Sequence, residues 1–259
     1  MKNFDLSNRS RFVWLAIFAM AMGFLEGIVV IYLRELYYPQ GFGFPLTLMS
    51  PELVSVEWIR EITTLIMLAT VCIIAGRNNL QRLLYFLFTF GVWDIFYYVA
   101  LKVLIGWPAS LLTWDLLFLI PVSWLSPVLA PVICSVTMIV MALLITGKQE
   151  KGFTIDPRPI DWILIAGGAA IILYTFMIDY MKLVFDGGVL APENSSDVRG
   201  QLLNKITNYL PGTYNWFLFI IGELMIIAAT VKILIQAKKA DQPEMKKEGG
   251  TAYAPDGLH

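Results

Sequence analysis

Ionisable side chains lie inside several otherwise apolar stretches of this sequence. Glu26, Asp94 and Glu223 each stand within such a stretch, and Arg60 and Glu61 form an adjacent pair near the start of another. A charged group deep in lipid costs at least ~2.5 kcal/mol on insertion scales, so such residues are functional candidates by default. Carboxylates in this setting can bind a proton or a cation, ligate magnesium, or act as general acids and bases.

A second pattern surrounds Asp94. Tyr98 and Lys102 follow it at spacings of four and eight residues, so the three side chains form one stripe on a helix. Gly91 continues this face and, having no Cβ, lets another backbone approach Asp94 closely. Asp115 is the next carboxylate in the sequence and can cover the stripe from above. We therefore expect the stripe to form a wall of a polar cavity that opens to the outer side.

Counting along the predicted spans places three of these carboxylates at a similar depth. At a rise of about 1.5 Å per residue, Glu26 lies roughly 20 Å from the cytoplasmic edge, and Asp94 and Glu223 lie about 17 Å from it. We predict that the three carboxylates share one cavity. In the alternative, structural interpretation, the charges form pairs that hold helices together, such as Glu26 with Arg60, or Asp94 with Lys102 through a tyrosine.

The residue types that are scarce exclude several kinds of site. The only histidine is His259, and the two cysteines, Cys72 and Cys134, stand in apolar runs. Zinc hydrolases of the HExxH type and bis-histidine haem proteins need at least two histidines, and a Ser-His-Asp triad needs one within the fold, whereas His259 stands in a polar tail. No metal site is predicted, and no cofactor can be assigned. A net charge of −1 gives no field that favours nucleic acid, so no nucleic-acid partner is expected.

The elements that must position these residues are membrane spans. Of the 259 residues, 58% are hydrophobic and only 15% are charged, whereas a soluble domain carries roughly a quarter charged residues. Several runs approach the ~20 residues that cross a bilayer as a helix. The composition predicts an all-α, polytopic helical membrane protein with about six transmembrane helices. They are expected at about residues 12–33, 57–76, 83–105, 126–146, 160–184 and 214–235.

The stretch before the fourth predicted span is too long for a simple connection. Residues 110–146 carry no charge except Asp115, and Pro121 and Pro127 interrupt them. We predict a short helix at about 110–120 that either re-enters the membrane or lies flat at its outer interface. Irregular backbone at membrane depth must be buried in protein or line a cavity, whereas the nearby tryptophans suit an interface.

The chain is organised as one transmembrane domain, residues 1–236, followed by a polar tail, residues 237–259. Gly23 and Gly27, four residues apart, predict a close helix contact beside Glu26. Basic residues are more frequent on the side that carries both ends of the chain. The positive-inside rule therefore predicts a multi-pass protein of the cell membrane with cytoplasmic N- and C-termini.

Three classes of function are open at this point. The small size, the aromatic-rich and methionine-rich spans and the lack of a catalytic signature favour a non-catalytic subunit or assembly partner of a larger membrane complex. The first alternative is a proton- or cation-coupled carrier of a small solute, with a carboxylate site in the outer half of the membrane. The second is an intramembrane enzyme that acts on a lipid or isoprenoid phosphate. The expected partners are the lipid bilayer and either other protein chains or further copies of this one.

Overall fold

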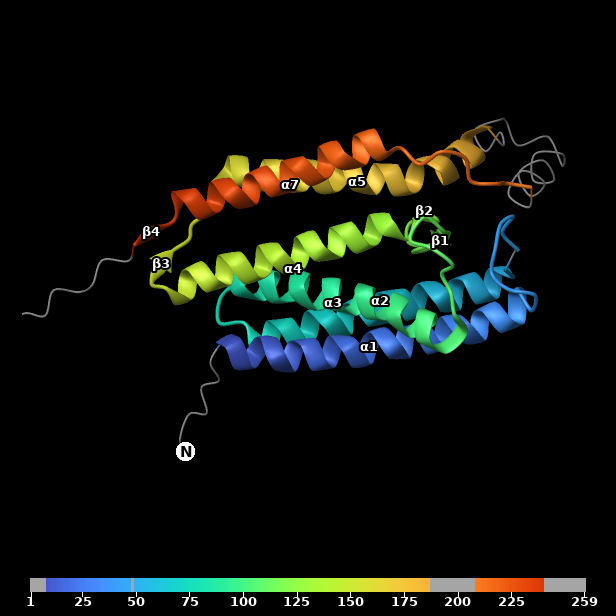
Figure 1. Ribbon diagram of the computed structural model, residues 1–259, viewed down its shortest axis with the longest axis horizontal. Coiled ribbons are helices and arrows are strands. Elements are labelled where there is room, and N and C mark those ends of the chain that lie inside the picture. Colours follow the sequence, from blue (N-terminus) through green and yellow to red (C-terminus); the bar gives the residue numbers. More distant parts are fainter. Residues whose placement is uncertain (1–7, 48, 187–207, 240–259) are drawn as a thin grey trace, which may run out of the picture.

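Six long helices run along a common direction in the computed structural model of the protein (Figure 1). The structure describes residues 8–47, 49–186 and 208–239. The helices are α1 (Asn8–Tyr37), α2 (Pro51–Ala75), α3 (Asn79–Ile105), α4 (Leu129–Glu150), α5 (Pro159–Asp186) and α7 (Trp216–Gln236). Each is long and apolar enough to cross a membrane, and many large apolar side chains are exposed on the helices, where lipid accommodates them. The prediction of an all-α polytopic membrane protein with six spans is confirmed.

Polar caps and a glycine define where the helices begin and end. Ser50 accepts a hydrogen bond from the backbone N–H of Leu53 at the start of α2, at 3.3 Å. Asn78 accepts one from the N–H of Gln81 at the start of α3, at 2.9 Å. Helix α3 ends at Gly106, whose φ of +71° lies in the left-handed region that glycine adopts without strain. Because their ends are capped, these two helices are longer than the apolar runs from which the sequence predicts them.

Glycines set the closest helix contacts. A Cβ added to Gly23 of α1 would lie 2.6 Å from the carbonyl oxygen of Trp93 in α3. A Cβ added to Gly91 of α3 would lie 2.7 Å from the carbonyl oxygen of Ser135 in α4. The predicted close contact at Gly23 is confirmed. The approach that Gly91 permits brings Ser135 beside Asp94, as the stripe on α3 predicts.

The helices form two groups joined by α4. In Figure 1, α1, α2 and α3 lie together, α5 and α7 lie together, and α4 runs between the two groups and contacts α3 and α7. The start of α1 and the end of α7 are at the same end of the bundle. There, β3 (Phe153–Thr154) pairs with β4 (Lys238–Lys239), so the turn after α4 is tied to the end of α7. Which compartment this end faces stays a prediction, and residues 240–259 of the predicted tail lie outside the described residues.

The stretch between α3 and α4 is not helical, and the prediction of a short helix at about 110–120 is wrong. The stretch forms a hairpin with two antiparallel strands, β1 (Trp114–Leu116) and β2 (Leu125–Pro127). A helix confined between Pro108 and Pro121 would have at most about 12 residues, a length at which isolated helices are marginal. Pairing of the strands satisfies the backbone N–H and C=O groups of the same stretch instead.

Candidate functional site

A cavity of about 280 Å³ lies between α1, α2 and α3 and is covered by the β1–β2 hairpin. Seven charged side chains line it, five carboxylates and two guanidinium groups. They are Glu26 and Arg34 of α1, Glu57, Arg60 and Glu61 of α2, Asp94 of α3 and Asp115 of β1. The wall of the cavity therefore carries an excess of negative charge among helices that span the membrane.

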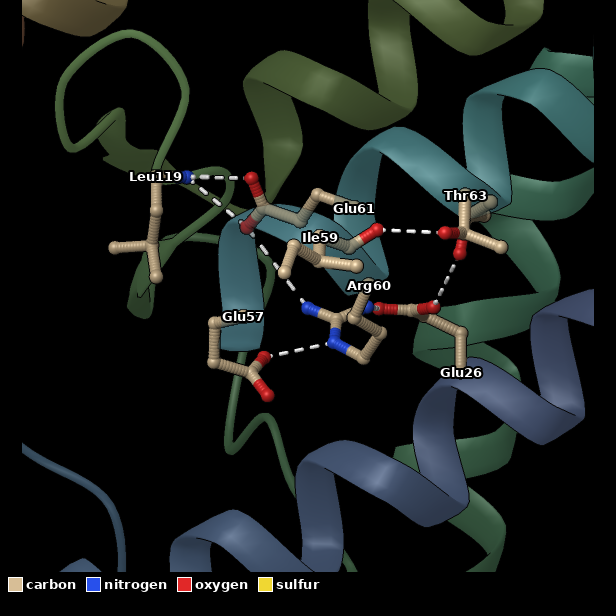
Figure 2. A network of polar contacts seen from close by, with 8 residues as sticks. Glu26, Glu57, Ile59, Arg60, Glu61, Thr63 and Leu119 are labelled. Atoms are coloured by element: carbon tan, nitrogen blue, oxygen red, sulfur yellow. Dashed lines mark hydrogen bonds and ion pairs between the residues drawn. The ribbon is translucent and has the colours of Figure 1, made fainter. Parts of the chain in front are cut away.

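Arg60 is surrounded by three carboxylates (Figure 2). Its guanidinium forms an ion pair with Glu26 of the neighbouring helix, and its Nε donates to Glu57 Oε2 at 2.7 Å. Arg60 Nη2 lies 3.8 Å from Glu61 Oε1. Thr64 donates its hydroxyl to the second oxygen of Glu26, at 3.5 Å. Arg60 is thus the shared counter-ion of three carboxylates. We call Glu26, Glu57, Arg60 and Glu61 the Arg60 cluster.

Helix geometry explains why α2 presents this cluster on one face. Glu57, Arg60, Glu61 and Thr64 follow one another at spacings of three, one and three residues, which place all four on the same side of a helix. Glu57 and Glu61 are both buried, at 4% relative exposure each, so this face is turned into the protein. Glu26 completes the cluster because Gly23, one turn earlier, brings α1 close to the bundle.

Glu61 also holds the hairpin in place. The backbone N–H of Leu119, in the loop between β1 and β2, donates to both carboxylate oxygens of Glu61, at 3.0 and 3.1 Å. Glu61 follows the first residue of α2, Pro51, by ten positions, so the loop reaches roughly 15 Å along this helix. The hairpin loop therefore contacts the inner face of α2, and whether it re-enters the membrane or lies at the interface stays a prediction.

A buried ion pair lies beneath the aromatic residues that follow α1 and α3. Arg34 Nη2 donates to Asp115 Oδ1 at 3.0 Å, and both side chains are at least nine-tenths buried. The guanidinium carbon of Arg34 lies 4.2 Å from the ring centre of Phe42 and 3.8 Å from that of Trp107. This double stacking fixes the cation. Burial raises the pKa of Asp115 to about 6, although the neighbouring Arg34 guanidinium opposes that rise.

Asp94 differs from the other cavity carboxylates because no cation among the described residues pairs with it. Its Oδ2 accepts a hydrogen bond from the Ser135 hydroxyl of α4 at 2.8 Å. No Lys or Arg in the described part of the chain forms an ion pair with it. Trp93, Tyr97 and Tyr98 line the cavity from the same stretch of α3. Asp94 is thus a carboxylate held by one neutral donor in an aromatic surrounding.

The structure brings most of the predicted site residues together. Those that line the cavity are Glu26, Arg60, Glu61, Asp94, Tyr98 and Asp115. Lys102 does not line it, because its Nζ donates to the carbonyl oxygens of Gly106 and Pro108 at 3.1 and 2.8 Å and closes the end of α3.

Glu223 of α7 lies apart from the cavity, so the expectation of one cavity for Glu26, Asp94 and Glu223 is wrong for this residue. It accepts a hydrogen bond from the Thr137 hydroxyl of α4 at 2.7 Å and is buried between these two helices. Position along a span determines depth, but the direction that a side chain takes around the bundle depends on which helices are neighbours.

Three further functional candidates were missed in the sequence: Arg34, Glu57 and Tyr97. Arg34 stands at the end of an apolar run, where a basic residue is read as a loop or interface residue. Its spacing of eight residues from Glu26 was the available signal, because it places both on one helical face. Glu57 is four residues before Glu61, and Tyr97 is three residues after Asp94, so the same spacing argument applies to both.

The arrangement suits proton or cation binding better than metal chemistry. Within residues 8–47, 49–186 and 208–239, no three Asp, Glu, His or Cys side chains converge as a group that could hold a metal ion. The carboxylates of α1 and α2 surround Arg60 instead of a common point. Carboxylates that outnumber their cations in a nonpolar surrounding are neutralised by binding protons or a further cation.

Comparison of the chain with models of known protein families, with curated proteins and with solved structures found no match. The chemistry of the cavity is therefore the basis for inferring a function.

Proposed function

We propose that this protein is a proton- or cation-coupled carrier of a small solute, and that the cavity is its binding site. The observation that supports the proposal most is the Arg60 cluster, in which a single guanidinium serves three carboxylates on spans α1 and α2. Asp94, on the facing helix α3, adds a fourth carboxylate without an ion pair in the described part of the chain.

The excess of carboxylates provides a means of coupling. Transfer of uncompensated charge into a low-dielectric region costs several kcal/mol per ion, so the empty site favours bound protons. A cationic group that enters the cavity neutralises the same carboxylates and displaces those protons. Because solute and protons compete for one set of oxygens, movement of one is linked to movement of the other.

The hairpin supplies the irregular backbone that carrier sites commonly contain. Secondary transporters bind solutes near the midplane, where interrupted elements expose backbone groups to the cavity. Here the loop between β1 and β2 reaches into the bundle and is held by Glu61. Protonation of Glu61 removes the charge that binds the Leu119 N–H, so the proton load of the cluster and the position of the hairpin are coupled.

The other two classes of function have weaker support. An assembly partner needs no charged cavity inside its own spans, and the role of subunit stays a prediction from composition. A magnesium-dependent enzyme needs carboxylates that converge on one ion. Asp94 instead bonds Ser135 and Asp115 bonds Arg34.

Charge movement in reconstituted vesicles tests the proposal. The full chain is placed in liposomes on a solid-supported membrane, and currents are recorded after a step in external pH. We expect a transient current in the wild type that is lost in Glu61→Gln and in Asp94→Asn. Glu35→Gln is the matched control, because Glu35 is an exposed carboxylate on α1. Currents equal to those of protein-free liposomes, or equal in all four proteins, would overturn the proposal.

A further inference from the structure

The cavity wall around Asp94 is aromatic. Trp93, Tyr97 and Tyr98 line the cavity from α3, and Phe118 lines it from the hairpin. The ring centres of Trp93 and Phe118 are 6.0 Å apart, so the hairpin adds its ring to the group on the helix. Tyr97 and Tyr98 follow Asp94 by three and four residues, so both lie on its side of the helix. The cavity wall near Asp94 therefore carries aromatic rings from two elements.

Two polar groups in this wall, the half-buried carboxylate of Asp94 and the buried indole of Trp93, lack the partners that their neighbours have. In the described part of the chain Asp94 has one neutral donor and no cation, whereas Asp115 has Arg34 and the other carboxylates have Arg60. The indole N–H of Trp93 is buried and has no hydrogen-bond partner within the described ranges, and the residue is only 4% exposed. A buried donor is normally satisfied, and a carboxylate without a cation is costly among membrane-spanning helices, so both groups indicate a bound molecule.

The charges of the cavity determine the class of that group. Five carboxylates against two guanidinium groups disfavour an anion. Calcium needs six to eight oxygen ligands, whereas no three suitable side chains converge among the described residues. Magnesium is bound through one or two carboxylates together with substrate phosphates, and the excess of carboxylates disfavours a phosphate. An organic ammonium ion fits this wall, because its single positive charge is spread over the attached carbon groups and the faces of aromatic rings attract such groups.

We infer that the solute is a small organic ammonium ion, whose charge is bound by Asp94 between Trp93, Tyr97, Tyr98 and Phe118. The inference rests on the proposed function, because it names the solute of that same cavity. The volume of about 280 Å³ is near the lower limit of ordinary ligand sites, so the ion is compact. The indole N–H of Trp93 is then available to a hydroxyl or carbonyl oxygen of the same molecule.

Equilibrium binding to the full chain in nanodiscs tests the inference separately from transport. The probes are choline and its uncharged carbon analogue dimethylbutanol, followed by tryptophan fluorescence and calorimetry. We expect choline to bind at least roughly tenfold more tightly than dimethylbutanol, since cation–π and ionic contacts are lost in the neutral analogue. Asp94→Asn should remove this preference, while Glu35→Gln keeps it.

Phe118→Leu is the second variant, in case Asp94→Asn fails to fold. This ring lies on the hairpin, and its loss should weaken choline several-fold with little effect on dimethylbutanol. Equal affinity for the two probes, or choline binding that is unchanged in both variants, would overturn the inference. Choline binding without pH-step currents refutes the carrier alone. Currents without choline binding refute the ammonium ion alone.

Discussion

Replacing Arg60 by Gln is the most direct perturbation of the charged cavity. The guanidinium is paired with Glu26, lies 2.7 Å from Glu57 and 3.8 Å from Glu61, and its side chain is 22% exposed. Removing one partner from a buried ion pair costs roughly 3–5 kcal/mol, because the remaining charge is left uncompensated. Partial exposure of Arg60 moves the expectation to the lower end of that range. We expect Arg60→Gln to lower the free energy of unfolding by about 3 kcal/mol.

A second substitution should rescue the first if this reasoning is correct. In Arg60→Gln/Glu57→Gln one of the three stranded carboxylates is also removed, so the double variant should recover about 1–3 kcal/mol as the coupling between neighbouring sites. The free energy of unfolding is measured by steric trapping in bicelles at pH 7. Arg9→Gln is the matched control, because Arg9 is exposed at the start of α1. A loss of under about 1 kcal/mol in Arg60→Gln, or a double variant no more stable than the single, would refute the role of Arg60 as shared counter-ion.

Three other perturbations test the parts that shape the cavity. Gly91→Ala should lower the unfolding free energy by about 1–3 kcal/mol through overpacking against α4, while Gly147→Ala, with open space around it, should not destabilise; equal effects would contradict the close contact. Asp115, with its pKa raised to about 6 from 3.8, binds more protons in the folded than in the unfolded chain between these values. Wild-type stability should therefore fall relative to Asp115→Asn as the pH rises from about 4 to 7, and a constant or rising difference would contradict the burial of this group. Glu61→Ala removes both oxygens that accept the Leu119 N–H. A hydrogen bond to a charged acceptor contributes about 1.5–3 kcal/mol, so hydrogen exchange of the Leu119 amide should become roughly ten- to hundredfold faster. Unchanged exchange would show that the hairpin does not depend on Glu61.

The sequence was sufficient for the spans and for recognising which of them carry charged residues. Composition and run length determine how many helices can cross a bilayer, because the hydrocarbon thickness requires a fixed number of apolar residues. The contact at Gly23 was also predictable, since the absence of a side chain is a local property that admits a neighbouring backbone. Asp94 could be recognised because an acid in an apolar run is costly wherever that run is placed.

The hairpin required the tertiary structure. Its backbone groups are satisfied by strand pairing and by Glu61, which is 58 residues before Leu119 in the chain. A local pattern shows prolines and a long apolar stretch, but it does not show which distant carboxylate accepts the N–H. The predicted short helix was therefore wrong in type even though a folded segment was expected in that place.

Which charged residues line the cavity also required the tertiary structure. Glu26, Asp94 and Glu223 have similar depths in the sequence, yet Glu223 bonds Thr137 and stays between α4 and α7. Arg34 directly follows the predicted span 12–33, yet it is buried and pairs with Asp115, 81 residues away. Sequence determines depth because each residue adds a fixed rise along a helix. Only the packing of the helices decides which faces meet, because it depends on contacts between segments that are distant in the chain.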